Sequence, residues 1–144
     1  MSQSDAVVIG QALRDLVTKM SKRLRRQVGN LGAISHSEGH VMSLLMSQQE
    51  AYPSELGTAL RISSQFMSQI LNRLEGLGYI SRRAAPDDGR KTLVSLTKKG
   101  RGMVEESRRE REEWLAAVIA EKYTAKEMKV IREALALLAT LPDA

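Results

Sequence analysis

The stretch SELGTALRISSQFMSQILNRLEGLGYI, residues 54–80, decides the fold. Pro53 fits the first position of a short helix that is expected to stop near Arg61-Ile62. Ser63 can then cap a second helix, in which apolar side chains recur at three- and four-residue steps. The apolar stripe expected to face the core consists of Met67, Ile70, Leu71, Leu74 and Leu77. Two helices joined by so short a turn predict a helix-turn-helix unit.

The opposite face of the second helix carries mostly uncharged polar side chains. It consists of Gln65, Ser68, Gln69 and Asn72, flanked by Ser64 and Arg73. Glutamine and asparagine can bond bidentately to adenine, and serine can bond to several base edges, so this face is suited to reading DNA in the major groove. The alternative is a face that only meets solvent, but such a face more often carries Glu and Lys.

The segment YISRRAAPDDGRKTLVSLT, residues 79–97, predicts a β-hairpin after the helix-turn-helix. At its tip Arg90 could reach a minor groove, where narrow A·T-rich sequence concentrates negative potential. Asp88 could brace the Arg90 guanidinium, and Lys91 adds a neighbouring cation. The turn is therefore interpreted as a rigid mount for a DNA-contacting arginine.

The positive charge of the chain is concentrated around this hairpin. Residues 81–102 hold seven Lys and Arg against two Asp, which accounts for the whole formal net charge of +5. A local positive field on an otherwise balanced molecule favours a polyanionic partner, most commonly nucleic acid. A basic loop that is merely solvated is the alternative that charge alone leaves open.

Composition narrows the class of protein further. A chain of 144 residues is about one domain. The absence of cysteine excludes disulfides, thiolate zinc sites, cysteine nucleophiles and a thiol peroxide switch, and it suits a reducing compartment. No segment resembles an export signal or approaches the ~20 apolar residues of a membrane span. We expect a cytoplasmic protein with no membrane partner.

Amphipathic helices are predicted on both sides of the winged segment. The first carries apolar residues at helical steps from Leu13 to Val28 and is expected to end near Gly29-Asn30. A serine at 35 or 37 can cap the next helix.

After the hairpin, Thr97 can cap a long helix of mixed charge, and Thr124 with Glu127 has capping-box spacing for a last helix. The apolar stripe of the last helix, wide for a lone terminal helix, consists of Met128, Ile131, Ala134, Leu135, Leu137, Leu138 and Leu141. It favours packing against a second chain, with packing inside one monomer as the alternative.

Taken together, these residues resemble the MarR family of winged helix-turn-helix transcriptional regulators over nearly the full chain. The resemblance is carried by residues 54–80, by the D-x-R wing motif of Asp88-Gly89-Arg90, and by LVSLTKKG leading into the next helix. It implies a mainly α fold with a small β-hairpin wing and a helical dimerisation layer. Residues 1–144 would form a single domain, in which residues 35–97 bind DNA and residues 1–30 and 98–144 dimerise.

For function, the resemblance implies a homodimeric regulator that binds double-stranded DNA. Residues at DNA would be Ser64, Gln65, Ser68, Gln69 and Arg73 on the recognition helix, and Asp88 and Arg90 at the wing tip. A two-fold dimer would read a palindromic operator, because its recognition helices repeat about every 34–36 Å or a multiple of this. Relatives commonly bind small aromatic carboxylates between the two layers, for which His36, His40 and Arg14 are candidate polar lining.

Three positions depart from the pattern of the family. Tyr52 precedes Pro53 where many relatives carry a capping Thr or Ser. Asn72 stands where Asp is common before the Arg of the recognition helix, so Arg73 is expected to lack an intrahelical ion pair and to be freer to reach phosphate. Phe66, often Thr in relatives, is expected to pack internally, with contact to a thymine methyl as the alternative.

Enzymatic chemistry is not indicated. His36 and His40 are the only histidines, and although their i, i+4 spacing could supply two metal ligands, no cysteine completes a set. There is no glycine-rich phosphate loop or G-x-S-x-G motif, and we expect no cofactor. The favoured function is a ligand-responsive repressor, and the alternative is a winged-helix module that binds an acidic protein through its basic hairpin.

Overall fold

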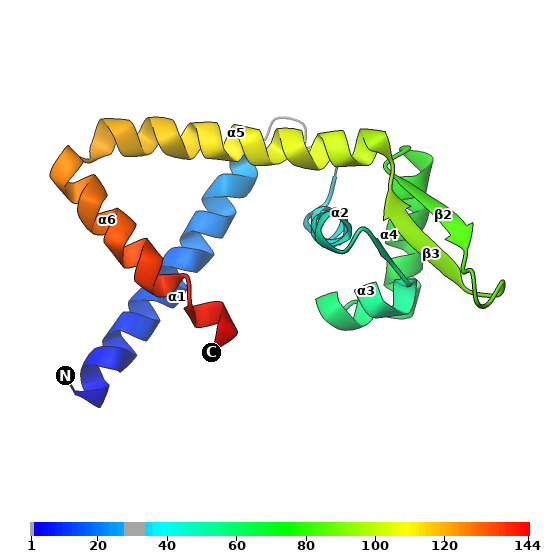
Figure 1. Ribbon diagram of the computed structural model, residues 1–144, viewed down its shortest axis with the longest axis horizontal. Helices are drawn as coiled ribbons and strands as arrows, with labels where there is room; N and C mark the ends of the chain where they lie inside the picture. Colours follow the sequence, from blue (N-terminus) through cyan, green and yellow to red (C-terminus); the bar gives the residue numbers. More distant parts are fainter. Residues whose placement is uncertain (1, 28–33) are drawn as a thin grey trace.

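The computed structural model describes residues 2–27 and 34–144. The elements in chain order are α1 (Gln3–Arg26), α2 (His36–Gln48), β1 (Glu50–Ala51), α3 (Pro53–Leu60), α4 (Ser64–Gly76), β2 (Ile80–Ala84), β3 (Thr92–Leu96), α5 (Lys98–Lys122), α6 (Ala125–Leu138) and the short 3₁₀ helix η2 (Leu141–Asp143). Figure 1 shows a winged unit of α2, α3, α4 and the strands at one end of α5, with α1 and α6 at the other. The expected mainly α fold with a small wing is confirmed, while the expected helix end at Gly29-Asn30 lies outside the described residues, as does Val28.

The helix-turn-helix forms from α3 and α4 as the sequence predicts. Arg61 adopts a left-handed conformation (φ 55°) after α3, and the Ile62 N–H donates to the Gly57 carbonyl over 2.9 Å. A Cβ at Gly57 would lie 2.9 Å from the Ile62 carbonyl oxygen, so this turn requires a glycine there. The Ser63 hydroxyl then accepts from the Phe66 N–H over 3.2 Å and caps α4.

The apolar stripe of α4 forms the centre of the core. Its buried side chains pack with buried residues of α2, α3 and β3. The central buried side chains are Val41, Met42, Leu45, Leu56, Met67, Ile70, Leu71, Leu74 and Val94. Leu77, expected in the same stripe, is the C-cap residue of α4 and is only partly buried. Burying one face of α4 fixes which face remains outside.

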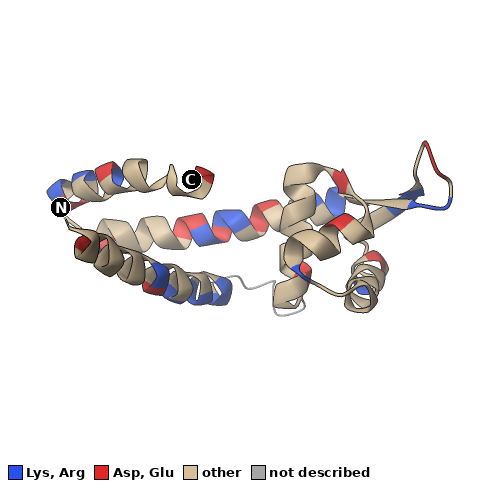
Figure 2. Ribbon diagram, turned by 90° about the horizontal axis from the view of Figure 1, so that it is seen from below, with Lys and Arg blue, Asp and Glu red and all other residues tan. Residues whose placement is uncertain are grey.

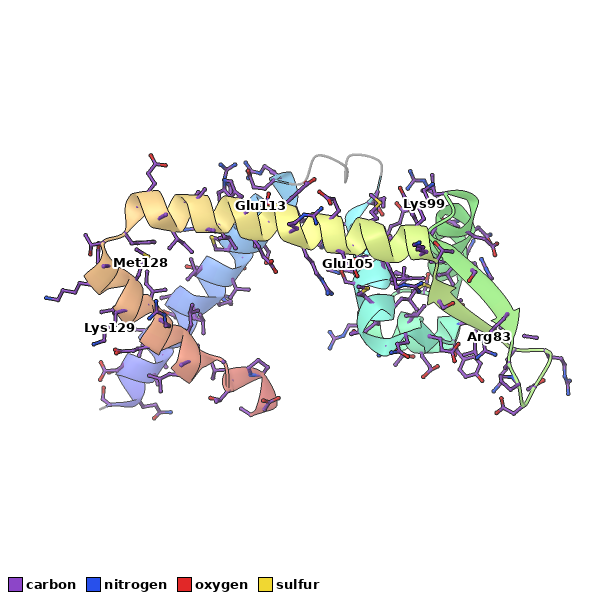
Figure 3. The ribbon with its side chains drawn as sticks, turned by 45° about the horizontal axis from the view of Figure 1, so that its top comes forward. Arg83, Lys99, Glu105, Glu113, Met128 and Lys129 are labelled. Atoms are coloured by element: carbon purple, nitrogen blue, oxygen red, sulfur yellow. The ribbon has the colours of Figure 1, made fainter. Side chains whose placement is uncertain are left out.

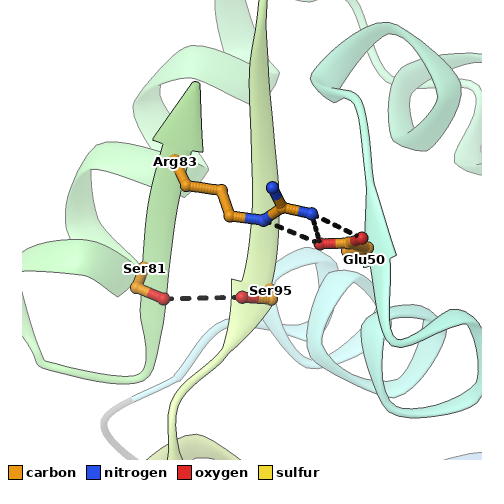
Figure 4. Close-up of polar contacts among 4 residues, drawn as sticks. All are labelled: Glu50, Ser81, Arg83 and Ser95. Carbon is orange, nitrogen blue, oxygen red and sulfur yellow. Dashed lines mark hydrogen bonds and ion pairs between the residues drawn. The ribbon is translucent and has the colours of Figure 1, made fainter. Parts of the chain in front are cut away.

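The wing belongs to a three-stranded antiparallel sheet in the order β1-β3-β2. The two-residue strand β1 was not predicted from sequence. Arg83 on β2 reaches across β3 to Glu50 on β1, with Nη2 2.9 Å from Oε1 and Nε 3.2 Å from Oε2 (Figure 4). The hydroxyls of Ser81 and Ser95 lie 3.4 Å apart on β2 and β3 in the same view. These contacts tie the hairpin to the strand that follows α2.

The start of α5 is joined closely to the winged unit. The Thr97 hydroxyl donates to the Gly78 carbonyl over 2.6 Å and accepts from the Gly100 N–H over 3.0 Å. Lys99, labelled in Figure 3, donates to the Leu77 carbonyl over 2.9 Å. A Cβ at Gly100 would lie 2.1 Å from the Tyr79 carbonyl oxygen, so only glycine allows the helix to approach this closely.

Among the residues that the structure describes, the other end of the single chain has no buried core of its own. Helices α1 and α6 contain no buried residue. Large apolar side chains that are more than half exposed there are Val7, Val8, Ile9, Leu16, Val17, Val130, Leu135, Leu137 and Leu141. Packing within one monomer therefore does not account for these side chains.

A pair of glycine substitutions on α5 tests the close approach at its start. Gly100→Ala should lower the free energy of unfolding by about 1–3 kcal/mol, because the added methyl group collides with backbone that must then shift. Gly102→Ala meets nothing within 4 Å and should raise it by up to ~1 kcal/mol through helix propensity. Urea denaturation followed by circular dichroism, at one protein concentration, measures both changes. Equal effects of the two substitutions would contradict the contact.

Candidate nucleic-acid interface

The exposed face of α4 presents the polar side chains that the sequence placed there. Ser64, Gln65, Ser68, Gln69 and Asn72 are all exposed. They stand opposite the buried stripe, and the exposed positions begin at the N-terminal end of α4. The N-terminal part of a recognition helix is the part that contacts base edges in related docking geometries.

Asn72 is held by an arginine that the sequence pattern did not assign to this face. Arg82 Nη2 donates to Asn72 Oδ1 over 2.8 Å, and Arg82 Nε lies 3.6 Å from Glu75 Oε2. Arg82 comes from β2, so the hairpin and the helix are joined at the interface itself. The sequence shows that this segment is positively charged, but it does not show that Arg82 pairs with Asn72.

Arg73 forms an ion pair with Glu38, which lies near the start of α2. The expectation that the loss of an intrahelical partner leaves Arg73 freer to reach phosphate is therefore wrong, because a carboxylate from another helix takes that place. The Glu38 side chain is only 5% exposed, whereas that of Arg73 is 50% exposed. One side of the guanidinium is thus anchored, while the side chain remains half in solvent.

Glu38 both pairs with Arg73 and helps to cap the N-terminus of α2. Its Oε1 accepts from the Ser35 N–H over 2.8 Å, and its own N–H donates to the Ser35 hydroxyl over 3.2 Å, which completes a capping box for α2. Burial by itself raises the pKa of Glu38, but the Ser35 N–H and the Arg73 guanidinium favour the carboxylate, so its pKa is lowered overall. Glu38 is therefore ionised at neutral pH.

The wing tip holds an arginine that reaches into solvent. The Arg90 side chain is 96% exposed, while its N–H donates to Asp88 Oδ1 over 3.0 Å and its Nε lies 3.8 Å from the same oxygen. The Lys91 N–H donates to the Asp88 carbonyl over 3.0 Å, and its Nζ lies 5.6 Å from the centre of the Tyr52 ring. Figure 2 shows the cations of the hairpin gathered near this projecting end. Asp88 thus shapes the turn and leaves the Arg90 guanidinium outside.

Phe66 does not pack internally as expected. Its side chain is 45% exposed at the N-terminal end of α4, because the core positions of this helix begin with Met67. The structure thus leaves an apolar ring among the polar residues of this end of the helix.

A second candidate site is a cavity of about 510 Å³ between α1, α2 and α5. Its lining combines apolar side chains with Arg25, His36, His40 and Arg111. The rings of His36 and His40 lie 4.0 Å apart, and burial together with the charges of His40 and Arg25 lowers the pKa of His36.

Arg111 Nε is buried with no hydrogen-bond partner in the described part of the chain. Arg14 does not line this cavity, since it is exposed and lies 3.8 Å from Asp15 on the same helix.

Other kinds of site were sought among the same residues. No group of three or more His, Cys, Asp or Glu side chains that could hold a metal ion occurs within residues 2–27 and 34–144. Nor does any helix in those ranges have the length and apolar character needed to cross a membrane.

Comparison with known proteins agrees with this geometry. The MarR family matches residues 34–92. An uncharacterised HTH-type transcriptional regulator of Bacillus subtilis, YdgJ, is 35% identical over 103 residues, which cover 72% of this chain and 62% of that protein. An uncharacterised HTH-type transcriptional regulator of Mycobacterium bovis is 29% identical over 88% of this chain and 87% of its own. The crystal structure of a putative transcriptional regulator from Pseudomonas aeruginosa superposes with a TM-score of 0.83, at 29% identity over 99% of both chains. With its winged helix-turn-helix and D-x-R wing, the chain is thus similar to the MarR family, whose match covers its winged segment.

Proposed function

We propose that this protein is a DNA-binding transcriptional regulator, and not an enzyme, that places α4 in a major groove and its wing in the neighbouring minor groove. The observation that carries the proposal is the pairing of an exposed, hydrogen-bonding face on α4 with a wing tip whose Arg90 side chain is 96% exposed. Uncharged amides and hydroxyls can distinguish base edges, and an exposed guanidinium suits the negative potential of a narrow groove. The match of residues 34–92 to the MarR family supports the same function.

The functional division expected from the sequence follows from this proposal. Residues 35–97 would contact DNA, and residues 1–30 and 98–144 would pair two chains within a single-domain protein. The favoured action is that of a repressor on a palindromic operator in the cytoplasm. Two-fold symmetry of the protein would be matched by two-fold symmetry of the operator.

One substitution in the wing and one on α4 test the proposed DNA contacts. Arg90→Ala should weaken binding to all duplexes and reduce the salt slope by about one, since a guanidinium that replaces a counterion is lost. Gln69→Ala should change base preference at one position by about 1–3 kcal/mol, since it removes hydrogen bonds to a base edge. Fluorescence anisotropy across a salt series, with a duplex selected by the wild-type protein and a scrambled duplex, measures both effects.

Lys129→Ala serves as the control, because Lys129 lies on α6 at the far end of the molecule (Figure 3). Its binding should equal that of the wild type. Unchanged salt slope and unchanged preference in both interface variants would overturn this assignment of the surface. Failure of the wild type to bind any duplex would favour the acidic-protein partner instead.

The second copy in this proposal covers exposed apolar side chains of α1, α6 and η2. These three elements carry nine large apolar side chains that are each more than half exposed in the single chain. Soluble monomers rarely leave apolar patches of this extent uncovered, and obligate homodimer interfaces are apolar in this way.

Leu135→Lys should therefore raise the dimer dissociation constant by about tenfold or more, because an exposed leucine is replaced by a charge that would be buried at the interface. Sedimentation velocity should give the wild type a mass near twice 16.0 kDa and the variant a lower average mass. Lys129→Gln, on the same helix, should behave as the wild type. A wild-type protein that sediments as a monomer at micromolar concentration would contradict the pairing.

The cavity between the two layers is proposed to bind a small aromatic or anionic effector. Arg25 and Arg111 supply positive charge, and Leu24, Met103 and Val104 supply apolar lining. The buried Arg111 Nε has a donor to offer a carboxylate.

Benzoate tests this assignment. It should bind the protein in isothermal titration calorimetry and weaken duplex binding, and Arg111→Gln should reduce its affinity about tenfold by removing a charge-assisted hydrogen bond. Arg14→Gln should leave benzoate affinity unchanged, because Arg14 lies outside the cavity. Equal benzoate affinity in the Arg111 variant and the wild type would show that the cavity does not hold the carboxylate.

A further inference from the structure

Asn72 is a residue of the polar face of α4 whose amide is held by the wing sheet. Its Oδ1 accepts from Arg82 Nη2 over 2.8 Å, and the Arg82 side chain is 27% exposed. Glu75, one turn further along α4, lies 3.6 Å from Arg82 Nε and forms an ion pair with the same edge of the guanidinium that carries Nη2. Two residues of α4, Asn72 and Glu75, thus contact this arginine.

The chemistry of the guanidinium decides how the amide is oriented. Arginine has hydrogen-bond donors only, so the atom of Asn72 that faces it must be the oxygen. In a planar amide the NH₂ group occupies the other branch, and Nδ2 is therefore directed away from Arg82. Because Asn72 is exposed on the reading face, Nδ2 is the group that a base edge would meet.

This orientation disfavours the usual pairing of asparagine with adenine. Bidentate pairing requires Oδ1 to accept from the adenine amino group while Nδ2 donates to N7. Here the positive charge of Arg82 lies beside Oδ1, and it repels an amino group and attracts an acceptor. Guanine presents two acceptors, N7 and O6, on its major-groove edge.

We infer that Asn72 reads guanine, as a donor whose orientation is set by Arg82. This inference rests on the proposed function, since it concerns how the α4 face selects one base of its operator. Gln69 lies one turn earlier on the same face, and its amide makes no hydrogen bond within residues 2–27 and 34–144. The restriction to a donor therefore applies to Asn72 and not to its neighbour.

Selection from a duplex library with a randomised core of about 20 base pairs, long enough to span two half-sites, tests the inference with the full-length protein. Asn72→Ala removes the amide, so the base pair at which this variant loses its sequence preference is the one that Asn72 contacts. The wild type should select guanine at that base pair. Arg82→Met should shift that position from guanine toward adenine by about fivefold or more, because the amide is released. Arg82→Lys, which keeps a cationic donor, should retain guanine.

Asn72→Asp provides a second arm that leaves Arg82 in place. A carboxylate beside Arg82 has no donor, so guanine preference should be lost, and cytosine, which offers an amino group, should be gained. Circular dichroism shows whether each variant is folded, and if Arg82→Met is not, the Asn72→Asp variant decides alone. Retention of guanine in Asn72→Asp, or an unchanged profile in a folded Arg82→Met protein, would overturn the inference while the proposed function stands. A wild type that selects no sequence would mean that the proposed function itself fails.

Discussion

Alternation of side chains along β2 sends the consecutive residues Arg82 and Arg83 to opposite faces of the sheet. Arg82 bonds to Asn72 on α4, and Arg83 bonds across β3 to Glu50. One short strand therefore fixes both the recognition helix and the edge strand that follows α2. A register shift of one residue would exchange these two arginines and break both contacts. The placement of the wing relative to α4 depends on this register.

A second set of contacts joins α4 to α2. Glu38 caps α2, is almost fully buried, and pairs with Arg73 on the recognition helix. A buried carboxylate is costly unless hydrogen bonds and a counter-charge stabilise it, and here both are present. Because α2 also lines the cavity through His36 and His40, the same helix borders the candidate effector site and contacts the candidate DNA-binding helix.

Local patterns predicted most of the fold, and long-range partners were the part they missed. The helical stripe of α4, the cap at Ser63 and the Asp-Gly turn each depend on neighbours within a few residues, so their signals are visible in the sequence. The partner of Arg73 lies 35 residues away and that of Asn72 lies 10 residues away, and no periodicity links them. The strand β1 was missed because two residues are too few to show alternation. The exposure of Phe66 depends on where the core boundary of α4 falls, which composition alone does not give.

Helix α5 connects the two ends of the molecule as a single rod. At a rise of 1.5 Å per residue its 25 residues extend over about 37 Å, and Gly100 seats its first turns directly on the backbone of Tyr79. Since the start of α5 is seated closely on the winged unit, a tilt of this helix would move the wing. A tilt of about 5° at the end near α6 corresponds to a displacement of about 3 Å at the wing, which is comparable to the spacing of one base pair. Because Gly100 leaves no room for a side chain between α5 and Tyr79, a tilt of α5 would be passed directly to the winged unit.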